Sequence, residues 1–265
     1  MWWSRTVFWL RIGAALFAGA VGVLAVLDYY GVITLLPSFE PIVWSISLAI
    51  IAVDNIGSLI SRGIRARVGR RNERIEKALM GLMISLVKNR SLRFEDLGVS
   101  VYVPWWRDRF RRRPHMHVRL KRIVRYRPAG YPPQSGVSWT PGKGVVGEAW
   151  SRRKTRHKNW HAIAARYAGQ DITEDQFLQI PEATRYGFAY EEFVSIVGKY
   201  SEVLAEPIWH GWKDRVMVGV LAIDRPYKAE EHTFRTQLDK KPTLEVAAAS
   251  ASTVGGILKP KADGA

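Results

Sequence analysis

The stretch whose spacing points most directly to chemistry is glycine-rich: Gly142-Lys143-Gly144-Val145-Val146-Gly147 fits the pattern G-x-G-x-x-G. In nucleotide-binding proteins such glycines let a backbone turn approach a phosphate closely. That chemistry needs a buried strand directly before the turn and an acidic residue about twenty positions after it. Here the preceding residues 127–141 are rich in Pro, Gly and Ser, which predicts a loop. We therefore expect these glycines to serve a tight turn and close packing rather than phosphate binding.

The acidic side chains form no recognisable catalytic arrangement. The chain has no cysteine, which excludes disulfides, thiol nucleophiles and Cys-based zinc sites. The motifs G-x-S-x-G and H-E-x-x-H are also absent from the sequence. The acidic clusters Glu191-Glu192 and Asp171/Glu174/Asp175 are typical of solvated helix faces and caps. The sequence therefore predicts a protein that is not an enzyme and needs no cofactor.

Two pairs of histidines have a spacing that metal ligands can use. His115 and His117 share one face of a predicted strand, and His157 and His161 stand four apart on a predicted helix. Neither pair has a cysteine or a well-placed carboxylate beside it, and such groups complete most zinc sites. We interpret them as surface histidines and predict no metal site.

Basic residues are concentrated in two segments. The chain carries 40 Lys and Arg against 24 Asp and Glu, a formal net charge of +16, which favours anionic partners. Six arginines fall between residues 62 and 74, and residues 104–115, PWWRDRFRRRPH, mix arginine with aromatic rings. Arginine and tryptophan together suit an anionic lipid headgroup layer, with nucleic acid as the less favoured alternative. The residues predicted to contact a membrane surface are Arg62, Arg65, Arg67, Arg70, Arg71, Trp105, Trp106, Arg111 and Arg112.

The first 61 residues read as a two-span transmembrane hairpin. Residues 7–30 and 42–60 are largely apolar and long enough to cross the roughly 30 Å hydrocarbon core. Lys and Arg are absent from residues 12–61 but flank this region on both sides. By the positive-inside rule we expect both termini in the cytoplasm of a cell with an inner membrane. Asp54 and Asn55 would then be polar residues within the second span.

The remaining chain predicts an α+β domain. Residues 62–90 form a basic linker helix in which Ile64, Val68, Ile75, Leu79, Leu82 and Leu86 recur at near-heptad spacing. Alternation predicts strands over 97–105 and 117–126, the latter with Val118, Leu120 and Val124 on one side. A short helix follows Gly144, further helices lie between residues 159 and 199, and strong strands cover 200–210 and 216–227. A helix rich in small residues spans 243–258, and residues 259–265 are a polar tail.

These pieces resemble, in this order, a GAF domain over about residues 72–258. The resemblance rests on the leading helix, on PGKGVVGEAW at 141–150, and on VLAEPIWHGWKDRVMVGVLAIDRP at 203–226. It implies an antiparallel sheet of five or six strands with helices on both sides, over residues 91–258. Residues 155–199 would lie over the sheet as the lid of a ligand pocket. The side chains expected to line that pocket are Trp139, Lys143, Trp160, Tyr186, Phe188 and Trp209.

The sequence thus favours a membrane-anchored GAF-like sensor or scaffold that binds a small molecule or a protein partner. We expect it to signal by association, with a homodimer formed through the linker helix and the C-terminal helix. In an alternative function, the hairpin itself clusters and alters membrane permeability when ligand binds. A third hypothesis is a membrane protein that tethers nucleic acid.

Overall fold

The computed structural model describes residues 13, 16–17, 19–24, 26–32, 40–90, 92–105, 119–211, 216–231 and 233–258. The chain divides into two units, Met1–Gly69 and Arg70–Ala265. One helix, α2 (Glu40–Arg90), contributes residues to both of them.

The first unit is helical wherever it is described. The described residues between 13 and 29 are helical and end in a turn at 30–32, and α2 begins at Glu40. None of the helices in these described segments is sufficiently long and apolar to cross a membrane. The prediction of a two-span hairpin over 1–61, and with it the prediction of an inner-membrane location, is therefore wrong. Ser45, Ser47, Asp54 and Asn55 stand within residues 42–60 of α2, and polar side chains make it costly to place a helix in lipid.

The second unit is built on one antiparallel sheet in the order β2-β1-β5-β4-β3. The class is α+β with five strands, as the sequence predicts for this part of the chain. The strands are β1 (Gly98–Pro104), β2 (Leu120–Tyr126), β3 (Arg156–Asn159), β4 (Tyr200–His210) and β5 (Val216–Pro226).

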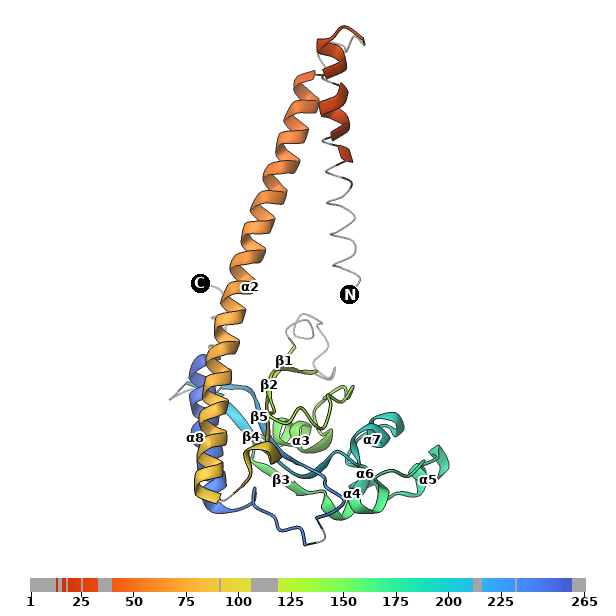
Figure 1. Ribbon diagram of the computed structural model, residues 1–265, viewed down its shortest axis with the longest axis vertical. Helices are drawn as coiled ribbons and strands as arrows, with labels where there is room; N and C mark the ends of the chain where they lie inside the picture. Colours follow the sequence, from red (N-terminus) through yellow and green to blue (C-terminus); the bar gives the residue numbers. More distant parts are fainter. Residues whose placement is uncertain are drawn as a thin grey trace. The chain divides into compact units, whose positions relative to one another are not determined.

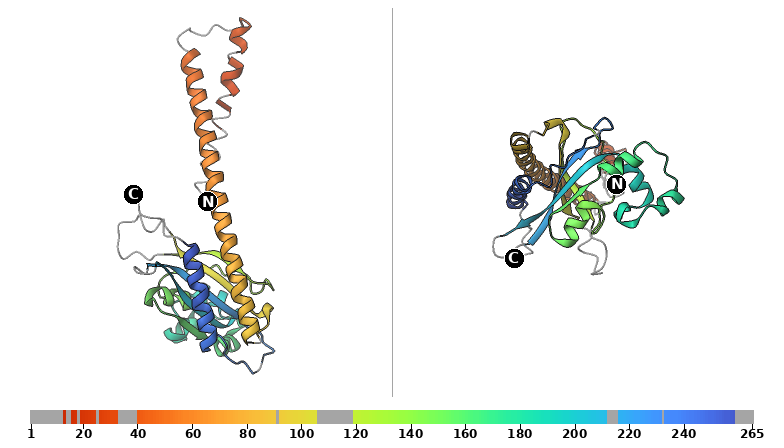
Figure 2. Two further views of the ribbon diagram at one scale, coloured as in Figure 1. Left: turned by 90° about the vertical axis from the view of Figure 1, so that its left-hand side faces the viewer. Right: turned by 90° about the horizontal axis from the view of Figure 1, so that it is seen from below.

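Two helices cover one face of the sheet. Residues 70–90 of α2 and the whole of α8 (Lys241–Ile257) lie side by side there (Figures 1 and 2). The near-heptad stripe explains why: Ile75, Leu79, Leu82 and Leu86 are all buried against the sheet. Burial of each such side chain contributes roughly 1.5–3 kcal/mol. The two earliest members of the stripe, Ile64 and Val68, belong to the first unit and are exposed.

The opposite face of the sheet carries α3 (Gly144–Arg152) and a set of short helices (Figure 2, right). We call residues 160–199, which lie between β3 and β4, the lid. The lid contains α4 (His161–Tyr167), α5 (Glu174–Gln179), α6 (Glu182–Arg185) and α7 (Tyr190–Ile196). Its side chains pack into a small core of their own around Phe177 and Phe193. A capping box begins α5, in which Thr173 and Gln176 hydrogen-bond each other's backbone amides.

A β-bulge decides which residues of β2 face the lid. Val101 pairs with Val124 and Tyr102 pairs with Arg122, so Ile123 is the extra residue. The bulge reverses the alternation of β2. Leu120 consequently packs on the lid side and Val124 on the helix side. The prediction that these two residues share a face is wrong, because a strict period of two does not survive a bulge.

Candidate ligand-binding site

A cavity of about 40 Å³ lies between the sheet and the lid. A volume of this size holds roughly three water molecules. Strands of the sheet form its floor, and α3, the loop before α3, and the lid form its walls and roof. It is lined by Ser100, Tyr102, Arg122, Trp139, Val145, Val146, Trp160, Phe188, Ile196, Tyr200, Val203, Ala222 and Asp224.

The floor follows from strand alternation. On β1, Ser100 and Tyr102 point toward the lid side while Val99 and Val101 belong to the core under the helices. β5 repeats the pattern, with Ala222 on the cavity side and Leu221 and Ile223 in the helix-side core. The polar floor residues Ser100, Arg122 and Asp224 therefore arise from three different strands, and β1 pairs with both of the others.

The roof is aromatic. The Trp139 ring meets Tyr102 edge to face at 5.5 Å between centroids and meets Phe188 in the same way at 5.9 Å. Trp160 lies 6.2 Å from Phe188 and 5.9 Å from Tyr186, again between centroids. Contacts of this kind contribute about 0.5–1.5 kcal/mol each beyond burial, so the rings hold the lid against the sheet.

The glycine-rich turn uses its amides internally. The amide of Gly142 donates to the carbonyl of Gly147 (2.9 Å), and that of Gly144 donates to Tyr186 in the lid (2.8 Å). The amides of Lys143 and Gly147 donate to Thr140 and Lys143 at 3.1 and 3.0 Å. A phosphate loop needs amides free to face an anion, and these four are already bonded. The arrangement supports a turn that attaches α3 to the lid.

Two glycines of this turn need their lack of a side chain. Gly144 adopts a φ of +59°, and a Cβ there would meet Phe188 at 2.6 Å. A Cβ on Gly147 would lie 2.1 Å from the carbonyl oxygen of Thr140. Both substitutions would push the roof residue or the turn away from the cavity.

Besides the Gly144 amide, two contacts between side chains fasten the lid to α3 and its turn. Lys143 Nζ forms an ion pair with Glu192 on α7 at 2.8 Å, and Glu192 also accepts from the amides of Ser138 and Ala189 at 3.1 Å. Burial alone would raise the pKa of Glu192, but these hydrogen bonds, led by that from Lys143, lower it on balance. Tyr186 donates its hydroxyl to Glu148 on α3. Burial and this acidic partner raise the pKa of Tyr186 above its ordinary value.

The floor carries more positive than negative charge. Asp224 forms an ion pair with Arg127, and burial lowers the pKa of the Arg127 guanidinium to about 10. The Arg122 guanidinium lies over the Tyr102 ring, 5.9 Å from its centroid. Burial raises the pKa of Tyr102 to about 12, so its hydroxyl is protonated at neutral pH. The pKa of Lys199 is lowered by burial and by Arg125 and Arg122, whose charges repel the ammonium group.

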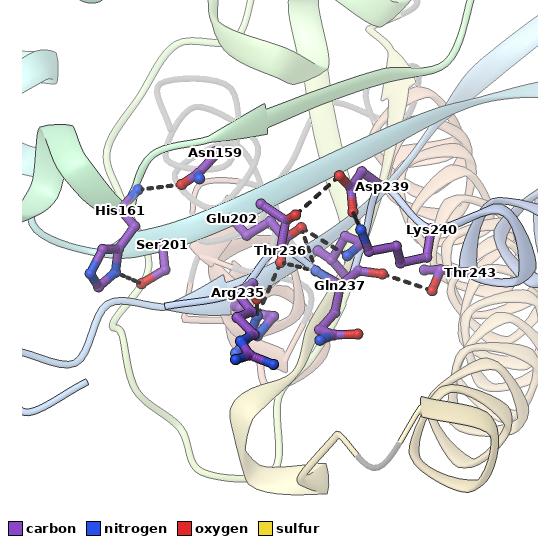
Figure 3. A network of polar contacts seen from close by, with 12 residues as sticks. Asn159, His161, Ser201, Glu202, Arg235, Thr236, Gln237, Asp239, Lys240 and Thr243 are labelled. Atoms are coloured by element: carbon purple, nitrogen blue, oxygen red, sulfur yellow. Dashed lines mark hydrogen bonds and ion pairs between the residues drawn. The ribbon is translucent and has the colours of Figure 1, made fainter. Parts of the chain in front are cut away.

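A buried carboxylate beside the floor stabilises the loop before α8. Glu202 accepts hydrogen bonds from His157 Nε2 (2.8 Å), from Arg225 (3.1 Å), and from the backbone amides of Gln237 (3.0 Å) and Leu238 (2.8 Å). Figure 3 shows this loop gathered around Glu202, with Thr243 of α8 bonding back to the Gln237 carbonyl at 2.9 Å. Desolvation raises the pKa of Glu202, but the donors, His157 first, outweigh it and lower the pKa.

The histidine pair on β3 and α4 has separate polar partners. His157 bonds Glu202, whereas His161 lies 3.3 Å from the Ser201 hydroxyl and stacks on Phe234 with centroids 4.5 Å apart. Figure 3 shows the His161 ring directed to Ser201 and apart from the Glu202 carboxylate. Each ring has a structural contact of its own.

Three of the six predicted pocket residues line the cavity: Trp139, Trp160 and Phe188. Lys143 and Tyr186 lie outside the lining and fasten the lid. Trp209 is in β4 against α8, where its carbonyl oxygen would lie 2.1 Å from a Cβ on Gly255. Sequence reasoning missed four polar residues of the floor: Ser100, Arg122, Tyr200 and Asp224. Their only signal in the sequence is the strand face on which alternation places them.

The other predicted contact residues are dispersed. Arg62, Arg65, Arg67 and Arg70 are exposed on α2, and Arg71 follows them there, half-buried. Trp105 directly follows β1, and Lys121 Nζ lies 5.1 Å from its ring centroid. Asp54 and Asn55 belong to α2. Trp106, Arg111, Arg112, His115 and His117 lie outside the described residues.

Comparison with known proteins gives no match. No family model matches the chain, nor does any curated protein or solved structure. The GAF resemblance therefore stays a prediction, and the functional argument rests on the cavity itself.

Proposed function

We propose that the second unit, Arg70–Ala265, is a small-molecule-binding module rather than an enzyme. The observation that carries the proposal is the cavity under the lid, in which aromatic rings face a polar floor. Ligand sites are typically concave and mostly apolar, with a few polar groups that fix orientation. The lining of this cavity has that composition.

The way the lid is attached supports a binding role. The lid is a continuous stretch between two paired strands, with its own small core. It meets the rest of the cavity wall through ring contacts, the Lys143–Glu192 ion pair, the Tyr186–Glu148 hydrogen bond and the Gly144 amide, which donates to the Tyr186 carbonyl. These few contacts between the lid and the wall can break and re-form while the sheet stays folded. A ligand larger than about three waters would enter by displacing the lid, and closure over it would change the surface offered to a partner protein.

The test is native mass spectrometry of the full-length chain after incubation with a bacterial metabolite extract. Val203 is half-buried on the cavity floor, so Val203→Phe fills the cavity. Val194 on α7 is 40 % exposed, so Val194→Phe is the matched control for the same change outside it. We expect an added mass on the wild type and on Val194→Phe, and none on Val203→Phe.

Two results would count against the proposal. An added mass that persists on Val203→Phe would place the ligand elsewhere, and an apo mass for every sample would leave no small-molecule role for the cavity. Circular dichroism checks that Val203→Phe is folded. If it is not, Ala222→Val makes a smaller change to the same floor.

A further inference from the structure

The charge balance of the cavity floor indicates what kind of molecule it accepts. Arg122 lines the floor, and the charges of Arg122 and Arg125 both act on the neighbouring Lys199 ammonium group, which lies outside the lining. The acid on the floor, Asp224, is already paired with Arg127. Within the ranges that the structure describes, Arg122 has no carboxylate partner, and its contact with Tyr102 leaves its charge uncompensated.

The acids of the roof are committed to other partners. Glu192 pairs with Lys143, and Glu148 accepts from Tyr186 and pairs with Arg152 and Arg156 at 3.0 and 3.3 Å. Neither carboxylate is among the groups that line the cavity. The Arg122 guanidinium therefore faces a cavity with an excess of positive charge, and an anion is the complementary guest.

The rest of the lining limits the anion further. Val145, Val146, Ile196 and the rings of Trp160 and Phe188 give the cavity an apolar side. An inorganic oxyanion would bury oxygens against these groups without hydrogen-bond donors, which is costly. A carboxylate instead presents two oxygens to a guanidinium in a fork geometry and carries an apolar tail. The volume of about 40 Å³ admits only a short tail while the lid is closed.

We infer that the cavity binds a small organic monocarboxylate, with its carboxylate on Arg122 and its tail against Trp160 and Phe188. This inference rests on the proposed binding function and adds the chemical class of the ligand. It assigns a specificity role to Arg122, a residue that the aromatic pattern of the sequence does not single out. The Tyr102 hydroxyl, protonated at neutral pH, is positioned beside Arg122 as a neutral donor.

The experiment compares three probes of the same length with the full-length chain: butyrate, butyramide and butylamine. Binding is followed by tryptophan fluorescence and isothermal titration calorimetry at constant ionic strength, since Trp139 and Trp160 line the cavity. We expect butyrate to bind at least tenfold more tightly than either analogue. Arg122→Gln should abolish this preference, and Arg122→Lys should restore part of it because lysine keeps the charge but not the fork.

Arg74→Gln is the matched control, because Arg74 is exposed on α2 outside the cavity lining. This variant should bind butyrate as the wild type does. Thermal unfolding of each variant separates lost binding from lost folding. If Arg122→Gln is unstable, the partial preference for butyrate expected of Arg122→Lys still tests the inference.

The contrary outcomes separate this inference from the proposed function. If butyramide binds as tightly as butyrate and Val203→Phe blocks both, the anionic class of the ligand is overturned, whereas the binding function is not. Butyrate binding that survives Arg122→Gln but not Val203→Phe would overturn the role of Arg122 alone. Butyrate binding that survives Val203→Phe would place the anion outside the cavity. No binding of any probe would overturn the monocarboxylate class, while the metabolite-extract measurement judges the binding function independently.

Discussion

At the scale of single residues, Glu202 is fully buried, and its carboxylate accepts hydrogen bonds from two side chains and two backbone amides. Its carboxylate joins β4 to β3 through His157, to β5 through Arg225, and to the loop before α8 through two amides. Because these donors outweigh desolvation, the folded protein holds the pKa of Glu202 below its ordinary value. The ionised side chain therefore stabilises the folded state above the unfolded-state pKa of about 4.3.

This residue gives the chain a predictable response to acid. The stabilisation by Glu202 should be lost as the pH falls below about 4.3 and through the lower folded-state pKa. Glu202→Gln should cost about 3 kcal/mol at neutral pH, because the buried Arg225 then keeps only Glu231, at 3.4 Å, as a carboxylate partner, and it should flatten the acid limb of the stability profile. Urea unfolding between neutral pH and the acid limb measures both effects. The assignment would be refuted if wild type and variant lost stability in parallel as the pH falls.

At the scale of the elements, α8 approaches β4 closely at Gly255, whereas the adjacent Gly256 faces open space. A Cβ on Gly255 would lie 2.1 Å from the Trp209 carbonyl oxygen, whereas a Cβ on Gly256 would meet nothing within 4 Å. The Gly255 carbonyl also lies 2.9 Å from His210 Nδ1, which fixes the helix to the end of β4. One glycine is required by packing and its neighbour is not.

The pair supplies its own control. Gly255→Ala should destabilise the protein by about 1–3 kcal/mol because the helix must move off β4. Gly256→Ala should stabilise it by about 0.5–1 kcal/mol, since alanine is the better helix former and no contact opposes it. Thermal unfolding of the two variants measures the difference. Shifts of the same sign would mean that α8 does not sit against β4 as described.

The elements also show how far the sequence could be read in advance. Periodicity located α8, β1, β4 and β5 because each carries a continuous apolar pattern on one buried face. β3, with the sequence RHKN, was missed because it is a polar strand that lies next to β4 at the edge of the described sheet. The floor residues of the cavity were missed because their orientation depends on strand pairing and on the bulge in β2. The apolar run at 42–60 misled, since it also contains Asp54 and Asn55 and the helix that holds it is not apolar enough to cross a membrane.

For the molecule as a whole, the boundary between the two units near residue 70 marks where α2 begins to pack into a core. Residues 61–69 of α2 are all exposed, whereas Ile75 and Leu79 are fully buried in the core of the second unit. Helices gain most of their stability from packing of this kind. The second unit should therefore fold without the first.

A chain that begins at residue 70 should melt within about 2 °C of the full-length protein, which corresponds to less than about 1 kcal/mol. A chain that begins at residue 80 is the control. It lacks Ile75 and Leu79 and should lose about 3–6 kcal/mol. Differential scanning calorimetry of the three chains checks this. A shorter unit that melts as early as the control would show that residues before 70 contribute to its core.

The position of the lid in the chain has an evolutionary consequence. All four lid helices are inserted between β3 and β4, which remain hydrogen-bonded neighbours however long the intervening segment is. Insertions and deletions there leave the strand order and the helix-covered face untouched, and loop closure adds only about 0.6 kcal/mol for each doubling of length. Related lineages can therefore reshape the roof over an inherited floor, and an engineer can graft a different segment at the same two junctions to alter ligand selectivity.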